Sequence, residues 1–264
     1  MESLKDQLVF ITGASAGIGA ACAEAFARHG ARLLLCARRA ERLHSLADRL
    51  RRAHDAAVHT FTLDVREAAR VEQALGALPA AWHAIDVLVN NAGLARAVDK
   101  VYENQRDHID VMIDTNVKGL LYVTRAVVPG MVARGRGHIV NIGSTAGHTV
   151  YPGGTVYCAT KHAVDAISKG LKMDLHGTPI RVSTVDPGLV ETEFSIVRFG
   201  GDEARAGAVY AGMQPLTPVD VADAVVYCAS RPPHVNISEV ILMPVDQSSA
   251  TMVHREEGPS PRPS

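Results

Sequence analysis

The sequence predicts an α/β fold in which helices cover both faces of a doubly wound sheet. Short apolar runs of strand length alternate with longer stretches of helical periodicity, as expected for strands joined by crossover helices. The run Ile85 to Val89 is apolar without interruption, as a parallel strand buried on both faces should be. With 264 residues, 47% of them hydrophobic, the chain can bury one large core. We therefore expect a single domain over residues 1–254.

The first predicted strand, Leu8 to Ile11, leads directly into a glycine-rich turn, Thr12 to Gly19, and then into helix formers. Glycines permit a tight turn and a close approach of the backbone to a pyrophosphate, and the free N–H groups at the helix start attract its charge. This context predicts a dinucleotide site, although the spacing GxxxGxG differs from the commoner GxGxxG. The predicted cofactor-binding residues of the turn are Gly13, Ser15, Gly17, Ile18 and Gly19.

The same turn also matches GxSxG, the nucleophile elbow of α/β-hydrolases, with Ser15 as the nucleophile. That motif likewise lies between a strand and a helix. In hydrolases several strands precede the serine, whereas Ser15 follows the first strand of this chain. We therefore interpret Ser15 as a donor to phosphate, and a serine hydrolase is the alternative.

The second predicted strand, Ala31 to Cys36, ends in Ala37-Arg38-Arg39. Chains that bind NAD tend to place an acidic residue here for the ribose hydroxyls, whereas an arginine accommodates the 2′-phosphate of NADP. Arg38 and Arg39 therefore predict NADP(H) as the cofactor. The alternative is that both arginines only begin the solvated face of the next helix, whose apolar residues recur from Leu43 to Leu50.

Two more predicted strands carry small or polar residues at their carboxyl ends. Val58 to Leu63 leads to Asp64-Val65, and the fourth strand ends in Asn90-Asn91-Ala92-Gly93. Such residues suit a close backbone approach to a cofactor, but the same letters also form ordinary turns. A helical stretch from about Gln105 to Val132 follows, in which we expect Pro129 to introduce a kink.

A fifth predicted strand, Ile139 to Ile142, ends in Gly143-Ser144, at the edge where α/β sheets bind ligands. Tyr157 and Lys161 follow four residues apart among helix formers, so both side chains leave one helix face. A nearby ammonium lowers the pKa of a phenol, and Ser144 could hydrogen-bond the same substrate oxygen. The three residues predict a proton-transfer site. The alternative is a solvated helix face and a serine that only turns the chain.

The rest of the chain predicts a sixth strand, a lid, a last helix and a final strand. Ile180 to Val185 is a strand that Asp186-Pro187-Gly188 breaks. Residues 189–213 are irregular and of mixed charge, which is typical of a mobile lid over a site. Thr217 and Pro218 begin the last helix. Residues 255–264 lack periodicity, and we expect a disordered tail there.

Charge and composition limit the possible functions. A net charge of -1 and a pI near 6.9 give no general attraction to nucleic acid or to an anionic membrane. Met1 to Gln7 carry charges before any apolar run, and no later run approaches membrane-spanning length, so a cytoplasmic protein is expected. The four cysteines lack CxxC spacing and the 12 histidines form no local ligand motif, so we expect no metal.

The joint occurrence of TGASAGIG, NNAG, Asn116, Ser144 and the pair Tyr157 and Lys161 resembles the short-chain dehydrogenase/reductase family over almost the whole chain. The resemblance implies one three-layer, Rossmann-type domain with about seven parallel strands, and nicotinamide-dependent oxidation of an alcohol or reduction of a carbonyl. It also implies that Tyr157 is the acid-base residue and that Lys161 lowers its pKa and holds the nicotinamide ribose. Ser144 would then donate to the substrate oxygen, and Asn116 would hold a water that relays protons.

Further cofactor contacts are implied in the same way. Asp64 and Val65 would meet the adenine. The adenosine-side ribose region would be met by Asn90, Ala92 and Gly93, and the nicotinamide carboxamide by Pro187, Gly188, Val190 and Thr192. The resemblance also implies a homotetramer.

The segments MIDTNVKGL, IVNIGSTAG and LMPVDQS are similar to a branch of NADP-dependent 3-hydroxy acid dehydrogenases that includes serine and L-allo-threonine dehydrogenases. This similarity implies interconversion of a small hydroxy acid or alcohol and its carbonyl compound. Relatives in the branch reduce sulfoacetaldehyde or clavulanate aldehyde, so a reductase of such an aldehyde is an alternative, as is a nucleotide-binding protein without turnover. In the lid, Arg198 is the candidate for the substrate's acid group, because a guanidinium matches a carboxylate or sulfonate with a bidentate fork. The alternative is a solvated loop arginine.

Overall fold

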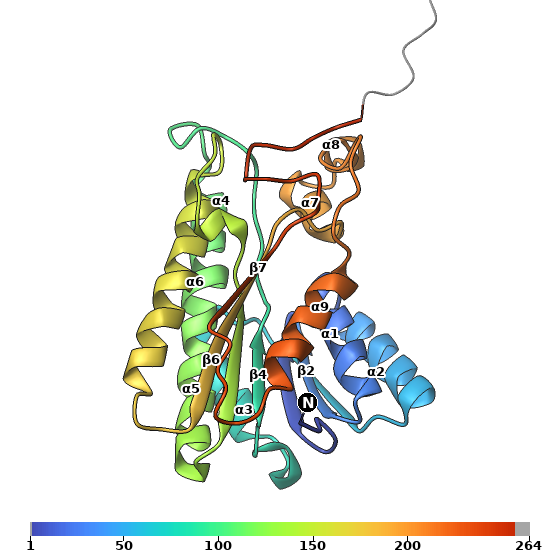
Figure 1. Ribbon diagram of the computed structural model, residues 1–264, viewed down its shortest axis with the longest axis vertical. Coiled ribbons are helices and arrows are strands. Elements are labelled where there is room, and N and C mark those ends of the chain that lie inside the picture. The colour runs from blue at the N-terminus through green and yellow to red at the C-terminus, as the bar shows by residue number, and fades with distance from the viewer. Residues whose placement is uncertain (1, 257–264) are drawn as a thin grey trace, which may run out of the picture.

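The computed structural model describes residues 2–256, which form one parallel sheet of seven strands with helices on both faces (Figure 1). The strand order is β3-β2-β1-β4-β5-β6-β7, and the neighbouring strands are parallel. The strands are β1 (Leu8–Thr12), β2 (Arg32–Ala37), β3 (Val58–Thr62), β4 (Val87–Asn90), β5 (Gly137–Ile142), β6 (Ile180–Pro187) and β7 (Glu239–Leu242). The fold class expected from the sequence is confirmed.

Helices form the two outer layers. They are α1 (Gly17–Arg28), α2 (Ala40–His54), α3 (Ala68–Gly76), α4 (Arg106–Ile113), α5 (Leu120–Arg134), α6 (Thr155–Asp174), α7 (Glu193–Arg198), α8 (Glu203–Ala208) and α9 (Pro218–Ala229). Helices α1, α2 and α9 cover one face of the sheet, whereas α3, α5 and α6 cover the other. None of the helices described is both long and apolar enough to cross a membrane.

The two cores follow from the alternation of side chains along each strand. In β1, Val9 and Ile11 point into the core shared with α1, α2 and α9. Leu8 and Phe10 point into the opposite core, where α3 and α5 pack. Both sets are almost completely buried, which explains why this strand is apolar at every position.

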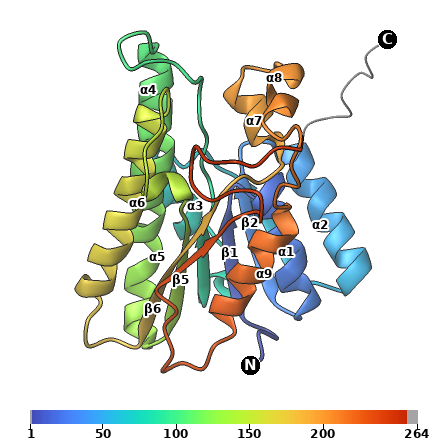
Figure 2. The same cartoon turned by 45° about the horizontal axis from the view of Figure 1, so that its top comes forward.

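The strand order reverses between β1 and β4, because the chain runs outwards from β1 to β3 and then returns to the other side. At such a switch point the connections leave in opposite directions, and the carboxyl ends of the strands border a crevice where α/β sheets bind ligands. Figure 2 shows α7 and α8 above this edge of the sheet. The predicted glycine turn, the Ser144 loop and the Pro187 segment all follow strands that end here.

The helical stretch expected from about Gln105 to Val132 consists of three pieces. Between α4 and α5 lies a π-helical turn, Asp114–Gly119, that contains Asn116. Its last residue passes close to the loop after β3, because a Cβ on Gly119 would lie 2.6 Å from Cγ2 of Val65. Pro129 lies inside α5, which continues to Arg134.

The lid and the start of the expected tail are more ordered than the sequence suggests. The lid contains two helices of six residues each, α7 and α8. Arg255 Nη2 donates to the carbonyl oxygen of Val209 at 2.9 Å, and the Glu256 amide donates to that of Gly212 at 2.7 Å. Composition could not predict these bonds, because their acceptors are backbone carbonyl oxygens of the lid. The rest of the expected tail, 257–264, lies outside the described residues.

A buried histidine in β5 makes stability depend on pH. His138 Nε2 lies 2.8 Å from Ser183 Oγ, and that hydroxyl donates to the carbonyl oxygen of Ile237. The Ser183 hydrogen is thereby used, so Nε2 must donate, and Nδ1 is a buried acceptor without a partner among the described residues. Burial lowers the pKa of His138 well below its usual value, and the charges of Arg181 and Lys172 lower it further.

We therefore expect the free energy of unfolding to fall below about pH 6.5, where the unfolded chain takes up a proton that folded His138 refuses. His138→Gln should flatten this dependence by about 1 kcal/mol per pH unit, measured by urea unfolding between about pH 7.5 and about pH 5.5. The exposed His176→Gln is the matched control and should keep the wild-type dependence. Identical curves for wild type and His138→Gln would contradict this assignment.

Candidate active site

A cavity of about 440 Å³ lies at the carboxyl ends of the strands and contains most of the predicted site residues. Those that line it are Gly13, Ser15, Ile18, Arg38, Arg39, Asp64, Val65, Ala92, Gly93, Ser144, Tyr157, Lys161, Pro187, Gly188, Val190, Thr192 and Arg198. Four others do not line it: Gly17, Gly19, Asn90 and Asn116. The fold thus brings together the glycine turn, the proton-transfer residues and the lid arginine.

Ser144, Tyr157 and Lys161 approach one another from two elements. Ser144 follows β5, and its Oγ accepts from the Ala146 amide at 3.1 Å, which begins a short helical turn. Tyr157 and Lys161 lie one turn apart on α6. The Lys161 ammonium is buried, donates to the carbonyl oxygen of Ile142 at 2.9 Å and lies 5.8 Å from the centre of the Tyr157 ring. It thereby ties α6 to the end of β5.

The acidities of this pair differ from the sequence expectation. Burial raises the pKa of Tyr157 and Tyr151 raises it further, while Ser144 and Arg198 act in the opposite direction. Lys161 is not among the groups that shift it in this structure, and its ammonium donates to the Ile142 carbonyl oxygen. Burial also lowers the pKa of Lys161 to about 8, against the charge of Asp186. At neutral pH the phenol is therefore protonated beside an ammonium.

Asn116 is almost completely buried and its side chain is occupied by protein partners. Its Oδ1 accepts from the Leu94 amide at 2.9 Å, and its Nδ2 donates to the Leu94 carbonyl oxygen at 2.8 Å and to Thr160 Oγ1 at 3.0 Å. The side chain thus joins the pocket-lining residue Leu94 to α6. The two amide hydrogens are both used, so a contact with a relay water would have to involve the main chain or the second lone pair of Oδ1.

The glycine turn is held against the end of β4. Gly13 has a φ of 66°, and a Cβ there would lie 2.9 Å from the Cα of Ala92, so only glycine fits. Asn91 Nδ2 donates to the carbonyl oxygens of Thr12 at 2.9 Å and Gly13 at 3.2 Å. The sequence reasoning included Asn91 only within the run Asn90 to Gly93 and gave it no role of its own.

Asn90, the selected neighbour of Asn91, points the other way. Its side chain is buried and donates to Asn141 Oδ1 at 2.9 Å and to Thr124 Oγ1 at 3.0 Å. Side chains alternate along a strand, so Asn90 joins the core while Asn91 turns to the glycine turn. Asn90 therefore supports the site from the core. Its side chain does not line the cavity, although the sequence predicted a cofactor contact for this residue.

The adenosine end of the cavity has a donor set that fits a phosphate. Arg38 and Arg39 follow β2, where Ala37 leaves no acidic side chain that would repel an anion. Arg39 lies over the glycine turn, since its Nε and Nη2 donate to Ser15 Oγ at 3.3 and 3.2 Å. These guanidinium groups could hold a 2′-phosphate. Because Gly13 has no side chain and lines the cavity, the backbone of the turn is open to a pyrophosphate.

The opposite end of the cavity is lined by aromatic rings and by Arg198. Its Nη2 donates to the hydroxyl of Tyr151 at 2.8 Å, and its guanidinium lies 5.7 Å from the centre of the Tyr157 ring. Phe194 packs against Tyr157 with ring centres 5.6 Å apart. Neither Tyr151 nor Phe194 was assigned a role of its own from the sequence. This end offers a cation beside a phenol in an apolar wall.

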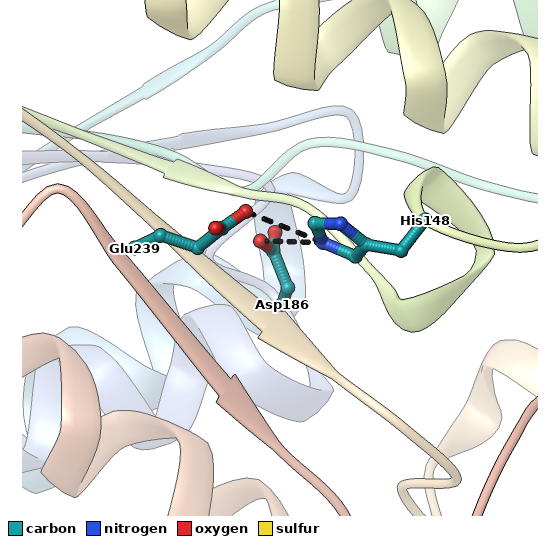
Figure 3. A group of neighbouring side chains, drawn as sticks. All are labelled: His148, Asp186 and Glu239. Carbon is teal, nitrogen blue, oxygen red and sulfur yellow. Dashed lines mark hydrogen bonds and ion pairs between the residues drawn. The ribbon is translucent and has the colours of Figure 1, made fainter.

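Three side chains converge beside the sheet: His148, which follows the turn after Ser144, Asp186 of β6 and Glu239 of β7 (Figure 3). His148 Nε2 lies 3.0 Å from an oxygen of Asp186 and 3.4 Å from an oxygen of Glu239. Burial raises the pKa of Asp186 to about 6, while His148 and Lys161 act against that rise. The fold thus brings one imidazole and two carboxylates, groups that can bind metals, within 4.8 Å of one another. The three residues are far apart in the sequence and form no local motif. The contact fastens the loop to β6 and β7.

Known proteins resemble this chain over nearly its full length. A family model described as short chain dehydrogenase matches residues 7–199. An NADP-dependent 3-hydroxy acid dehydrogenase YdfG of Salmonella typhi is 50% identical over 250 residues, which cover 94% of this chain and 99% of that one. Sulfoacetaldehyde reductase 2 of Chromohalobacter salexigens is 45% identical over 251 residues, covering 94% and 99%. The closed form of serine dehydrogenase complexed with NADP⁺ superimposes with a TM-score of 0.90 at 48% identity, covering 95% and 100%.

The packing at Gly143 gives a test of the site's architecture. A Cβ there would lie 1.7 Å from Oδ1 of Asp186, so Gly143→Ala must displace that carboxylate. We expect a loss of about 1–3 kcal/mol in the free energy of unfolding, as for other overpacked positions, measured by urea denaturation.

Gly170→Ala on α6 is the matched control, because a Cβ there meets nothing within 4 Å. It should stabilise by about 0.5–1 kcal/mol, the usual gain in a helix. Equal effects of the two substitutions would show that Asp186 does not pack against Gly143 in solution.

Proposed function

The chain belongs to the short chain dehydrogenase family, and we propose that it interconverts a small hydroxy acid and its carbonyl compound with NADP(H). The substrate class is a 3-hydroxy acid or a serine-like acid. The observation that supports this class best is Arg198, whose guanidinium shares one cavity with Tyr157, Lys161 and Ser144. A hydroxy acid needs both sets of contacts at once: Arg198 for its acid group, and the other three residues for its reacting hydroxyl.

NADP(H) supplies the hydride acceptor or donor when bound, and the chain's own residues hold it. The turn with Gly13, Ser15 and Ile18 would bind the pyrophosphate, and Arg38 and Arg39 the 2′-phosphate. Asp64 and Val65 would line the adenine end, Ala92 and Gly93 the ribose region, and Pro187, Gly188, Val190 and Thr192 the carboxamide. Gly17 and Gly19 act through the shape of the turn, and Asn90 through the core beneath it.

Tyr157 is the proton donor to the substrate carbonyl oxygen during reduction and accepts the proton during oxidation. Its raised pKa keeps the phenol protonated at neutral pH, which suits the reductive direction. In the oxidative direction we assign stabilisation of the phenolate to the Lys161 ammonium, which lies 5.8 Å from the ring centre although it donates to Ile142 in this structure. The same ammonium would also hold the nicotinamide ribose. Ser144 orients the substrate oxygen. Asn116 would hold the relay water through its main chain or the second lone pair of Oδ1, because its side-chain amide hydrogens are bonded to Leu94 and Thr160.

Arg198 would bind the carboxylate of the substrate. Its Nη2 donates to Tyr151, which leaves further guanidinium hydrogens for a planar acid group. Such a contact fixes the carbon that bears the hydroxyl relative to Tyr157. A sulfonate offers the same oxygen fork, so reduction of a small sulfonated aldehyde is the second candidate, and a reductase of that kind is 45% identical to this chain.

The proposal includes a homotetramer that works in the cytoplasm, as the family resemblance implies. Exposed apolar side chains on α9 and β7, among them Val219, Tyr227 and Ile241, are compatible with contacts between subunits. The proposal also includes a single catalytic domain in which residues 189–213 act as the lid. Helices α7 and α8 and the bonds from Arg255 support that role.

Tyr157→Phe tests the proton donor. The variant keeps the ring and its packing on Phe194 but loses the hydroxyl, so turnover should fall by about 10²- to 10⁴-fold while NADPH binding changes little. Turnover is measured as NADPH oxidation and binding by calorimetry without substrate. Lys161→Ala should impair both quantities, because one ammonium serves both. Near-normal turnover of Tyr157→Phe would remove this residue from the mechanism.

Arg198→Ala and Arg198→Lys test the acid site. Both should lower kcat/KM for a carboxylated or sulfonated substrate by about tenfold or more relative to a neutral aldehyde of similar size, since a charge-assisted pair is worth about 1.5–3 kcal/mol. Lysine should rescue only in part because it lacks the planar fork. Equal losses on charged and neutral substrates would show that Arg198 does not bind the acid group.

A further inference from the structure

The lid helix α7 is fastened to the body of the protein at both ends. Its last residue, Arg198, bonds to Tyr151 at the substrate end of the cavity. Its first residue, Glu193, reaches the adenosine end instead. Thr192 caps the helix, since its Oγ1 accepts from the Phe194 amide at 3.1 Å, and this fixes the direction in which Glu193 leaves the backbone.

Glu193 spreads its two carboxylate oxygens over two arginines at the start of α2. Oε2 lies 3.0 Å from Arg39 Nη1, and Oε1 lies 2.5 Å from Arg42 Nη1. Arg39 in turn donates to Ser15 of the glycine turn. A continuous polar chain therefore runs from the floor of the cofactor cavity through Arg39 to the lid.

The charge and exposure of this group allow exchange of partners. One carboxylate faces two guanidinium groups, which leaves a net positive charge that Arg38 increases. Arg42 and Arg39 hold the pKa of the Glu193 carboxyl below its usual range, so it is ionised at neutral pH. The side chains of Arg39, Glu193 and Arg42 are 45%, 42% and 50% exposed, so each pair is weak and a dianionic phosphate can compete for it.

We propose that Glu193 is a positioning residue that couples the hold on the lid to occupation of the 2′-phosphate site, because its carboxylate and the phosphate compete for Arg39. This inference rests on the proposed function. In the absence of phosphate, Glu193 occupies Arg39 and Arg42 and holds α7 against α2. When a 2′-phosphate engages Arg38 and Arg39, Glu193 gives up Arg39 and keeps Arg42, so one ion pair holds α7 instead of two.

The coupling predicts effects of opposite sign when the carboxylate is neutralised. Glu193→Gln frees Arg39 and removes a negative charge beside the phosphate, so NADPH should bind more tightly. The same change loosens α7, so the substrate contacts made by Arg198 should be held less firmly. NADH lacks the 2′-phosphate, and its affinity should hardly change.

The experiment measures NADPH and NADH binding by calorimetry without substrate, together with hydrogen exchange of the amides of residues 193–198. Glu193→Gln should bind NADPH about three- to tenfold more tightly, bind NADH within about twofold of wild type, and exchange these amides faster. KM for the acidic substrate should rise. Arg42→Ala should speed exchange without the gain in NADPH affinity, because Glu193 still occupies Arg39.

Glu203→Gln is the matched control, since it neutralises a first-turn carboxylate of the other lid helix, for which no ion pair is found within residues 2–256. It should change neither binding nor exchange. Unchanged or weaker NADPH binding by Glu193→Gln, or unchanged exchange, would overturn the coupling. A wild-type protein with no preference for NADPH over NADH would instead overturn the proposed cofactor. Hydrogen exchange of residues 193–198 would then still show whether the ion pairs of Glu193 hold α7.

Discussion

The buried ammonium of Lys161 is the interaction on which the rest of the site depends. It is 8% exposed and donates to the Ile142 carbonyl oxygen, so it fixes α6, and with it Tyr157, against the end of β5. A buried cation is costly unless other groups compensate it, and here Asp186 does so. Asp186 is itself buried and is compensated by His148, which reaches the surface beside Glu239. The charges that maintain the site therefore extend from the cavity to the edge of the sheet.

The second constraint is the lid, because it closes a cavity whose two ends need different chemistry. Helix α7 places Glu193 at the adenosine end and Arg198 at the substrate end, as the first and last residues of one short helix. Neither the ion pairs of Glu193 nor the hydrogen bond from Arg198 to Tyr151 is strong by itself at these exposures. Together they make the position of α7 sensitive to both ligands, which is a property that an enzyme with an acidic substrate and a phosphorylated cofactor can use.

Much of the fold could be predicted because its central strands are buried on both faces and its glycine turn has a backbone requirement that only glycine meets. The spacing of Tyr157 and Lys161 likewise predicted one helix face. The direction of the Tyr157 pKa shift could not be predicted, since burial and the diversion of Lys161 to Ile142 depend on packing. That Asn90 joins the core whereas Asn91 holds the glycine turn could not be predicted, because it depends on the residue at which the strand ends. Glu193 was missed because its partners lie more than a hundred residues away.

The most direct test of the central claim is the formation of NADPH from NADP⁺ by the purified wild-type protein with a panel of alcohols. The panel contains 3-hydroxy acids, serine isomers, sulfonated alcohols and neutral alcohols of matched size, each also assayed with NAD⁺. We expect kcat/KM to be highest for an acidic substrate with NADP⁺, by about tenfold or more over both the neutral alcohols and NAD⁺. Absence of NADPH formation with every substrate, or a preference for NAD⁺, would contradict the account.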